Sequence, residues 1–593
     1  MKKIFWIIIF FFVCHDQSIP INKDIAADDI YSHISFLASD KLEGRKAGSS
    51  FENTTAQYVK RCFKTYGLTP VGDNYIQKFD FIAGMTVGDG NFIEAEEKIP
   101  KSDFTTLSFS SSEKCTASLV FAGYGISATD IHYDDYENLE VKGKIVVVIR
   151  YSPDGTIQNG KFAQYNSLRY KAMVAREKGA AGIIFITGGL EDNNDDKLKT
   201  GGSLGGKQSV GIPAVHLKRS VMNDWLTSSE NPSIEELQNK INGHEDPHPA
   251  SFEIGKTVTI RTNINPESLE SCNVVGSLPG VGAFKNEWVI LGAHMDHLGW
   301  GGESSNTMVP DVHEIHNGAD DNASGIATLL ELAAYFAKDK NNSPYRRSLL
   351  FIAFGAEEVG LLGSAYFVEH PLIPLDSAVA MFNFDMVGRL RENSMVIGGT
   401  GTSPAWETLL INVNSDSIHF TFDDEGFGSS DHQSFYLKNI PVLFFFTGAH
   451  EDYHKPTDDI ELLNIKGMEK VAKLAARSTL HVLTEEKKPG FVKVESKKHS
   501  ERRGYNVTFG VVPDFVYNGD GFKISGVRDK APAGLAGMQA GDIIMSINNI
   551  TTLNIHDYMF ALQSCTAGVE VPVVITRNNV AMELKIAPQG KDE

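Results

Sequence analysis

Residues 288–299 read WVILGAHMDHLG, so that a short apolar run leads directly to a histidine and an aspartate. The run 288–291 has the length and composition of a buried β-strand, and His294 and Asp296 follow it. In an open parallel sheet, ligands bind just beyond the carboxyl ends of the strands. The stretch therefore predicts a strand of a central sheet and a site at its edge.

The same arrangement recurs further along the chain. Apolar runs at 349–354, 378–384 and 442–446 precede Glu357–Glu358, Asp385 and His454. Asp321, in NGADDNASG, instead precedes a predicted helix over 325–337. Strands and helices alternate from 261 to 484, which predicts an α/β domain with a mixed, largely parallel sheet flanked by helices.

These side chains together indicate a metal site. A neutral imidazole binds a divalent cation through one nitrogen, and Asp296 is placed to hold the other N–H of His294. Each motif alone has an ordinary explanation, such as a solvated histidine or an acidic helix start. Several buried carboxylates in one α/β zone, however, require a compensating cation.

The number of ligands indicates two metal ions. A carboxylate from Asp321 can bridge them, as in metal pairs about 3.5–4 Å apart. One glutamate of the pair Glu357–Glu358 is then left over as a general base for water. The residues alone leave open which of the two it is.

The order HxD, GADDNASG, EEVGLLGS, FDM and YH resembles the co-catalytic di-zinc aminopeptidases and glutamate carboxypeptidases of metallopeptidase clan MH. The resemblance implies two Zn²⁺ ions per subunit. Its ligand set is His294 and Asp385 for one ion, Glu358 and His454 for the other, and Asp321 as the bridge. It further implies Glu357 as base, Asp296 as the residue orienting His294, Tyr453 as a phenol steadying the oxyanion, and a cis peptide between Asp321 and Asn322.

Four other histidines lie in the same zone. We expect His297, His313 and His316 to be loop or supporting residues, whereas His432 is a candidate for lining a substrate pocket. None is needed as a ligand, because the five predicted ligands complete both shells.

The flanking segments resemble two accessory domains. Residues 102–260, with FAGYGI, VKGKIVVVIRY and GIPAVHL, resemble an inserted β-rich protease-associated (PA) domain. Residues 504–593 resemble a PDZ domain, which would accept a peptide C-terminus at Phe509–Val512. Residues 21–101 are assigned to the N-terminal part of the peptidase domain, 261–484 to the zinc peptidase domain and 485–503 to a charged linker.

The N-terminus predicts export. Lys2–Lys3 and the apolar run 4–13 form a signal peptide over 1–20, too short to span a bilayer. We expect a periplasmic, outer-membrane lipoprotein or secreted protein, with either a lipid anchor at Cys14 or simple cleavage nearby. No later apolar segment is long enough to cross a membrane, and a net charge of −20 argues against nucleic-acid binding. The four other cysteines form no CxxC pair, and most are expected as buried free thiols.

The primary prediction is an exported zinc-dependent aminopeptidase, a hydrolase that removes N-terminal residues from peptides by metal-activated water with Glu357 as general base. The first alternative is a carboxypeptidase of the glutamate carboxypeptidase type, for which Arg389 and Arg391 are candidate contacts to a substrate carboxylate. The others are a non-catalytic peptide-binding scaffold and glutaminyl cyclisation on the same fold.

Overall fold

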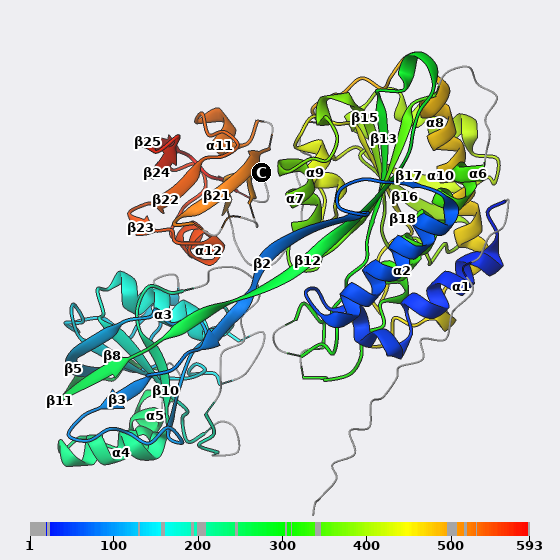
Figure 1. The fold of residues 1–593 in the computed structure, drawn as a ribbon. Coiled ribbons are helices and arrows are strands. Elements are labelled where there is room, and N and C mark those ends of the chain that lie inside the picture. Colours follow the sequence, from blue (N-terminus) through cyan, green and yellow to red (C-terminus); the bar gives the residue numbers. More distant parts are fainter. Residues whose placement is uncertain are drawn as a thin grey trace, which may run out of the picture.

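A computed structural model describes residues 19, 24–128, 131–155, 160–190, 195–198, 209–242, 247–302, 305–309, 311–338, 346–494, 507–514, 517, 519–528 and 530–590. Figure 1 shows three lobes, each built around its own sheet. The predicted signal peptide, apart from residue 19, lies outside the described residues, as do Cys14 and part of the predicted linker. No described helix is both long and apolar enough to cross a membrane.

The largest lobe holds a nine-stranded mixed sheet in the order β1-β12-β14-β13-β15-β18-β16-β17, with β2 beside β12. Its centre is parallel: β13 pairs with β14 and β15, and β15 pairs with β18. The strands are β1 (Thr69–Pro70), β2 (Ile76–Val87), β12 (Ile264–Leu278), β13 (Trp288–His294), β14 (Ser348–Phe354), β15 (Ala378–Phe384), β16 (Ser394–Gly398), β17 (His419–Asp423) and β18 (Val442–Phe446). The mixed α/β fold with a parallel centre agrees with the prediction, and the four predicted apolar runs lie in strands β13, β14, β15 and β18.

Helices cover both faces of this sheet, which is why its central strands are apolar along most of their length. The helices are α1 (Ala27–Leu37), α2 (Ser50–Tyr66), α6 (Gly325–Lys338), α7 (Leu362–Glu369), α8 (Trp406–Val413), α9 (His432–Tyr436) and α10 (Ile465–Thr484). α1, α2, α6, α8 and α10 share one core, and α7 and α9 share another on the opposite face. Asn322 caps α6, because its Oδ1 accepts the N–H of Gly325 at 2.9 Å.

β2 and β12 extend out of the first lobe as a long ribbon that leads to the second (Figure 1). The second lobe holds a seven-stranded sheet in the order β3-β11-β5-β8-β9-β10-β4. Its strands are β3 (Phe92–Glu94), β4 (Phe104–Thr106), β5 (Lys114–Ala122), β8 (Ile145–Ile149), β9 (Gly182–Ile186), β10 (Ala214–Leu217) and β11 (Ser251–Arg261), with α3 (Leu168–Glu177), α4 (Arg219–Ser228) and α5 (Ile234–Asn242). A small hairpin, β6 (Ser127–Ala128) and β7 (Tyr133–Asp134), adjoins it.

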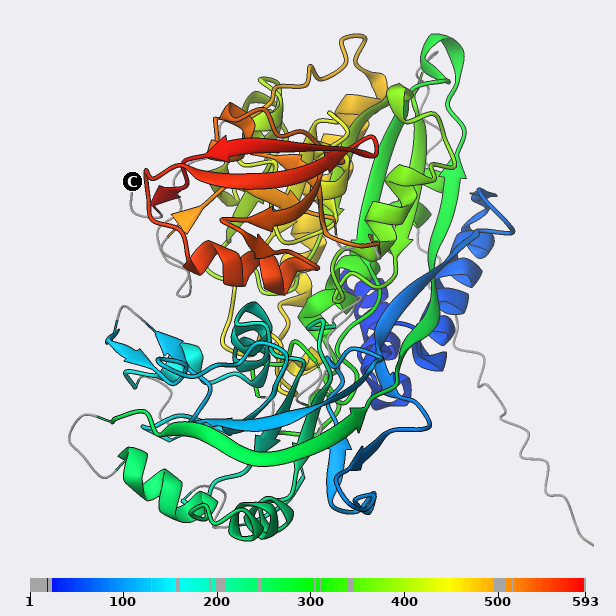
Figure 2. The ribbon, with the colours of Figure 1, turned by 90° about the vertical axis from the view of Figure 1, so that its left-hand side faces the viewer.

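The C-terminal lobe is a small β-domain that lies beside the other two (Figure 2). It contains β19 (Val507–Thr508), β20 (Val511–Pro513), β21 (Phe522–Val527), α11 (Pro532–Leu535), β22 (Ile543–Ile547), β23 (Ile550–Thr551), α12 (Ile555–Gln563), β24 (Val571–Arg577), β25 (Val580–Ile586) and β26 (Gln589–Gly590). α12 packs on α3 of the second lobe, where Arg176 Nη1 lies 3.1 Å from Asp557 Oδ1. Cys62, Cys115, Cys272 and Cys565 are free thiols, as expected, but only Cys62 and Cys272 are buried, whereas burial was expected for most of the four.

His33 ties together the helices that cover the metal-site lobe. Its Nδ1 lies 2.7 Å from the hydroxyl of Tyr58 and its Nε2 3.1 Å from that of Tyr66, both on α2. The side chain is fully buried, and burial lowers the pKa of His33 to about 3.

We therefore expect His33 to make folding stability depend on pH. In the unfolded chain histidine takes up a proton near pH 6.5, whereas the folded state keeps His33 neutral down to about 3. The contribution of His33 to the free energy of unfolding is thus fully present above pH 6.5. It is lost as the pH falls towards 3, by at most about 1.4 kcal/mol per pH unit. Urea unfolding of metal-free protein across this range should show a flatter pH dependence for His33→Gln. The control is His419→Gln, at an exposed histidine on β17; equal slopes for all three proteins would contradict the prediction.

Candidate metal centre

The predicted site residues converge at the carboxyl ends of four neighbouring strands. His294 ends β13, Asp385 follows β15 directly, and Glu357–Glu358 come three and four residues after β14. His454 arrives on the loop after β18. Asp321 lies in the irregular turn Ala319–Ser324, which leads into α6, and its peptide bond to Asn322 is cis, as the resemblance implied.

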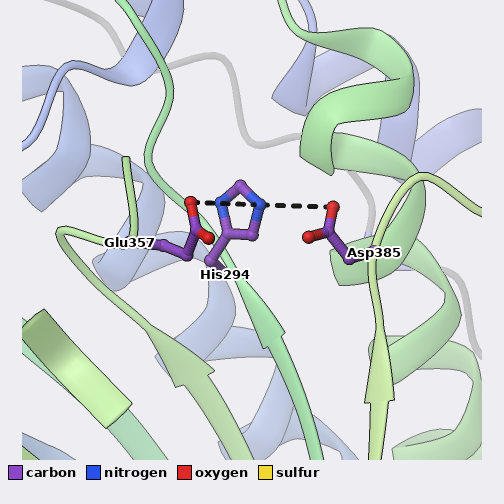
Figure 3. A group of neighbouring side chains, drawn as sticks. All are labelled: His294, Glu357 and Asp385. Carbon is purple, nitrogen blue, oxygen red and sulfur yellow. Dashed lines mark ion pairs between the residues drawn. The ribbon is translucent and has the colours of Figure 1, made fainter. Parts of the chain in front are cut away.

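One group of side chains surrounds His294. Its Nε2 lies 3.2 Å from Asp321 Oδ1, 3.3 Å from Asp385 Oδ1 and 3.9 Å from Glu357 Oε2. Figure 3 shows the imidazole between Glu357 and Asp385. The other oxygen of Asp385, Oδ2, accepts a hydrogen bond from Ser430 at 2.7 Å, which fixes the carboxylate with Oδ1 facing His294.

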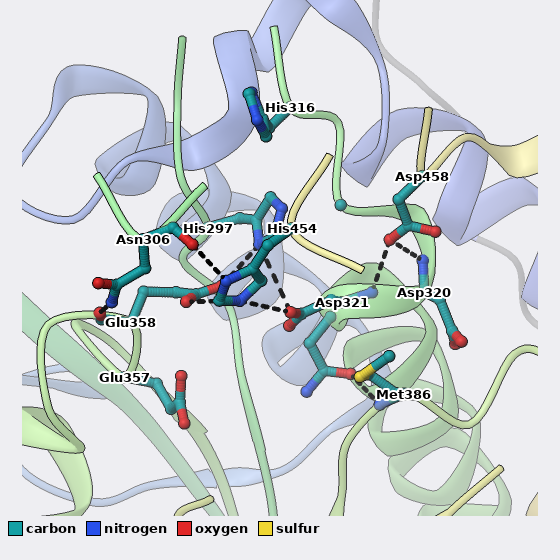
Figure 4. A network of polar contacts seen from close by, with 12 residues as sticks. His297, Asn306, His316, Asp320, Asp321, Glu357, Glu358, Met386, His454 and Asp458 are labelled. Carbon is teal, nitrogen blue, oxygen red and sulfur yellow. Dashed lines mark hydrogen bonds and ion pairs between the residues drawn. The ribbon is translucent and has the colours of Figure 1, made fainter. Parts of the chain in front are cut away.

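A second group surrounds His454 (Figure 4). Its Nε2 lies 3.2 Å from Asp321 Oδ2 and 3.2 Å from Glu358 Oε2. Its Nδ1 donates to the carbonyl of Asn306 at 2.8 Å, which leaves Nε2 as the free nitrogen. Asp321 therefore directs one oxygen to each group, the geometry required of a bridging carboxylate.

His297 lies closer to the second group than the sequence indicated. Its Nδ1 is 2.7 Å from Glu358 Oε1 and 3.9 Å from Asp321 Oδ2. With Asp321 and Glu358 it forms a triad whose ligand atoms fall within 4.8 Å of one another, as do those of His294, Glu357 and Asp385. The sequence analysis placed His297 among the loop or supporting histidines. It lies three residues after His294, and nothing in the local sequence indicates that its side chain reaches this group.

The residues fit a bound cation. Nε2 of His294 and Oδ1 of Asp385 are buried and have no hydrogen-bond partner among the described residues. Burial lowers the pKa of His454, but Glu358 and Asp321 raise it to about 11 overall. The carboxylates thus demand positive charge at this position, and a divalent ion between nitrogen and oxygen ligands supplies it.

The two adjacent glutamates have opposite electrostatic environments. Burial raises the pKa of Glu357 well above its usual range, whereas His454 and His297 overcome burial and lower that of Glu358 to about 2. Asp296 holds both in place, because its carboxylate accepts the backbone N–H of Glu357 at 2.9 Å and of Glu358 at 3.2 Å. The protein environment therefore favours the protonated form of Glu357 and the carboxylate form of Glu358.

Asp296 contacts His294 mainly through its backbone. His294 Nδ1 donates to the carbonyl of Asp296 at 3.2 Å, while the carboxylate is 3.9 Å away. The peptide carbonyl, more than the carboxylate expected from the sequence, fixes the tautomer that leaves Nε2 free.

Tyr453 and His432 have different surroundings. The ring of Tyr453 stacks on that of His454, with centroids 3.8 Å apart, and burial with the nearby carboxylates raises the pKa of its phenol. His432 is buried and stacks on Phe444, and burial lowers its pKa to about 3. His432 is thus a neutral packing residue in this structure.

The sequence analysis missed several residues of the site, because they belong to no recognised motif. Asp458 accepts the backbone N–H of Asp320 and Asp321 through one oxygen, at 2.9 and 3.0 Å, and pairs with Arg389 at 2.9 Å through the other. Asn306, on the loop between β13 and α6, donates its amide to the carbonyl of Glu358 at 2.7 Å. Both bind the backbone of residues predicted as metal ligands.

The fold and this cluster define a metal-dependent hydrolase, and comparison with known proteins narrows the class. Residues 273–479 match the model of Peptidase family M28, residues 115–225 that of the PA domain, and residues 523–577 that of a PDZ domain. The chain thus carries an M28 peptidase domain of clan MH together with PA and PDZ domains, as its motifs predicted.

Curated relatives of this chain are described as aminopeptidases. Aminopeptidase YwaD of Bacillus subtilis is 26% identical over 486 residues, which cover 79% of this chain and 88% of the relative. The probable lipoprotein aminopeptidase LpqL of Mycobacterium tuberculosis is 28% identical over 344 residues, about half of each chain. The solved aminopeptidase from Aneurinibacillus sp. strain AM-1 is 25% identical, with a TM-score of 0.46 over 82% of this chain and 99% of that one. The family match and the curated relatives confirm the predicted enzyme class, a metallo-aminopeptidase hydrolase.

Metal removal should lower the stability of the peptidase lobe. Without a cation, Asp321, Glu358 and Asp385 repel one another in a buried site, so chelated protein should unfold at a lower temperature and added Zn²⁺ should restore it. At a zinc concentration 100 times the dissociation constant, the gain is about 2.7 kcal/mol. Differential scanning calorimetry of the chelated and the zinc-loaded protein measures this difference in unfolding temperature. In His454→Ala the stabilisation by zinc should be smaller than in the wild type. Identical unfolding with and without zinc would contradict the assignment.

Proposed function

We propose that the protein is an exported zinc aminopeptidase that holds two Zn²⁺ ions and uses Glu357 as its general base. The observation that carries the proposal is the position of Asp321, whose two oxygens face two separate histidines at 3.2 Å each. A single-ion site would not need a carboxylate shared in this way. Peptides are the substrate class that fits a peptidase domain of this family.

The ligand assignment follows from which atoms are left free. His294 Nε2 and Asp385 Oδ1 face one position beside Asp321, and Glu358 Oε2 and His454 Nε2 face the other. We favour His454 over His297 as a ligand because the Nδ1 of His454 is already bound to a carbonyl. His297 instead directs its Nδ1 to Glu358, which suits a residue that orients a ligand.

Zinc, when bound, would act as a Lewis acid that polarises the peptide carbonyl and lowers the pKa of water, so that hydroxide forms near neutral pH. Glu357 would take the proton from the attacking water and pass it to the amine as the peptide C–N bond breaks, a role that requires a carboxyl pKa closer to neutrality than its usual value. Burial raises the pKa of Glu357 in that direction. Tyr453 remains protonated and is our candidate donor to the developing oxyanion.

The arginines argue against the carboxypeptidase alternative. Arg389 pairs with Asp452 at 3.0 Å and with Asp458 at 2.9 Å, so its charge is already matched by two carboxylates. Arg391 is exposed and donates to the carbonyl of Ala449. The scaffold alternative would require loss of ligands or base, and the chain retains every predicted one. Glutaminyl cyclisation is disfavoured because the curated relatives are described as aminopeptidases.

Export and peptide capture complete the proposal. The predicted signal peptide over 1–20, with an anchor at Cys14 or cleavage nearby, agrees with the relative described as a lipoprotein. In the PDZ domain β20 lies at the end of its sheet and, among the described strands, pairs only with β21. Its other edge is therefore our candidate for adding a peptide strand at Phe509–Val512.

Glu357→Gln should nearly abolish turnover while leaving the metal bound. The amide keeps the volume of the side chain but cannot accept the proton, and general bases contribute about 10²–10⁴-fold. We expect kcat on aminoacyl p-nitroanilides to fall by at least about 100-fold with an unchanged zinc content by mass spectrometry of metals. The matched control is Glu369→Gln, at the exposed end of α7, which should keep wild-type turnover. If Glu357→Gln retained its turnover, Glu357 would not be the general base.

An aminopeptidase should depend on a free N-terminus. We expect a peptide with a free amine to lose residues one at a time from that end, and its N-acetylated twin to remain intact. A peptide amidated at its C-terminus should still be cleaved. Mass analysis of the products decides, because cleavage of the acetylated peptide from its C-terminal end would establish the carboxypeptidase alternative.

A further inference from the structure

A buried arginine from the N-terminal segment reaches the metal centre. Arg45 lies between α1 and α2, outside the residues that match the peptidase family, and its exposed fraction is 1%. Its guanidinium donates to four backbone carbonyls, those of Leu37, Met295, Asn317 and Gly318. Three of them lie at least 250 residues away in sequence.

These carbonyls belong to the two backbone segments that carry metal ligands. Met295, which accepts at 3.0 Å, stands between His294 and Asp296. Asn317 and Gly318, which accept at 2.7 and 3.0 Å, directly precede the turn that holds Asp321. One guanidinium therefore fixes the spacing between His294 and the bridging aspartate.

Backbone contacts hold the arginine itself in place. The N–H of His297 donates to the carbonyl of Arg45 at 3.2 Å, and that of Gly299 donates to the carbonyl of Gly44 at 3.0 Å. Gly44 has a φ of 67°, and a Cβ there would lie 2.5 Å from the carbonyl oxygen of His316. The absence of a side chain at 44 lets this segment lie directly against the metal-site loop.

Arg45 also brings a positive charge to an acidic site. Burial lowers the pKa of Arg45 to about 10, while Asp321, Asp296 and two further carboxylates, Asp458 and Glu358, raise it. The guanidinium thus stays charged at neutral pH. A fixed cation at the back of the cluster lowers the cost of gathering these carboxylates before any metal binds.

We propose that Arg45 is a positioning residue of the metal centre, which sets metal affinity by fixing the separation of His294 from Asp321 and by partly neutralising the ligand carboxylates. This inference rests on the proposed metal site. It makes the N-terminal helix pair a functional part of the centre rather than a packing element alone.

The test is cobalt titration of chelated full-length protein, followed by the visible absorption of the bound ion. Arg45→Gln removes both the positive charge and the guanidinium group that donates to four carbonyls. We expect it to weaken Co²⁺ binding by about 10–100-fold. Arg45→Lys keeps the cation but cannot reach all four carbonyls, so it should recover part of the lost affinity. Arg61→Gln removes the same charge from an exposed position of α2 and should bind like the wild type.

The outcomes separate this inference from the proposed function. If the wild-type protein bound no cobalt, the proposal of a metal site would itself be wrong. Wild-type binding with unchanged affinity in both Arg45 variants would overturn only the role of Arg45. Circular dichroism of the metal-free variants covers the remaining case: if neither folds, Arg45 is a folding residue and the inference is wrong.

Discussion

The structure depends on one electrostatic constraint, the burial of five carboxylates at the edge of a sheet. Asp296, Asp321, Glu358 and Asp385 are buried and Glu357 is partly buried, and all five lie close to His294 or His454. Such a cluster is stable only if hydrogen bonds and cations compensate it. The surrounding polar contacts serve this requirement: backbone N–H groups bind Asp296, Ser430 binds Asp385, and Arg45 and Arg389 bring positive charge close to the cluster.

Much of this site was predictable from sequence because it is local. Each ligand follows a short apolar strand or precedes a helix, and parallel strands bring their carboxyl ends to one edge. The runs before His294, Glu357, Asp385 and His454 therefore predicted both β13, β14, β15 and β18 and the place where their side chains meet. The same reasoning predicted the helix that follows Asp321, which the structure shows as α6.

The supporting residues could not be predicted in this way. Arg45 acts on carbonyl groups, which every residue has, so its partners leave no mark in the sequence. Asn306 and Asp458 likewise bind backbone groups of residues far away along the chain. The actual contact between His294 and Asp296 also depends on backbone geometry, and the spacing alone indicated the carboxylate. Side chains that recognise backbone need a fold before they can be identified.

The division of labour between Glu357 and Glu358 illustrates how that fold creates chemistry. The two residues are identical and adjacent, and Asp296 holds the N–H of both. Only Glu358 meets His297 and His454, which stabilise its charge, whereas Glu357 faces His294 and other carboxylates, and its burial favours the protonated form. A change that moved this turn by one residue would exchange their surroundings and, with them, the directions of their pKa shifts. The hydrogen bonds to Asp296 hold both residues in this turn, and the contacts of Glu358 with His297 and His454, which Glu357 lacks, make the two carboxyl groups differ.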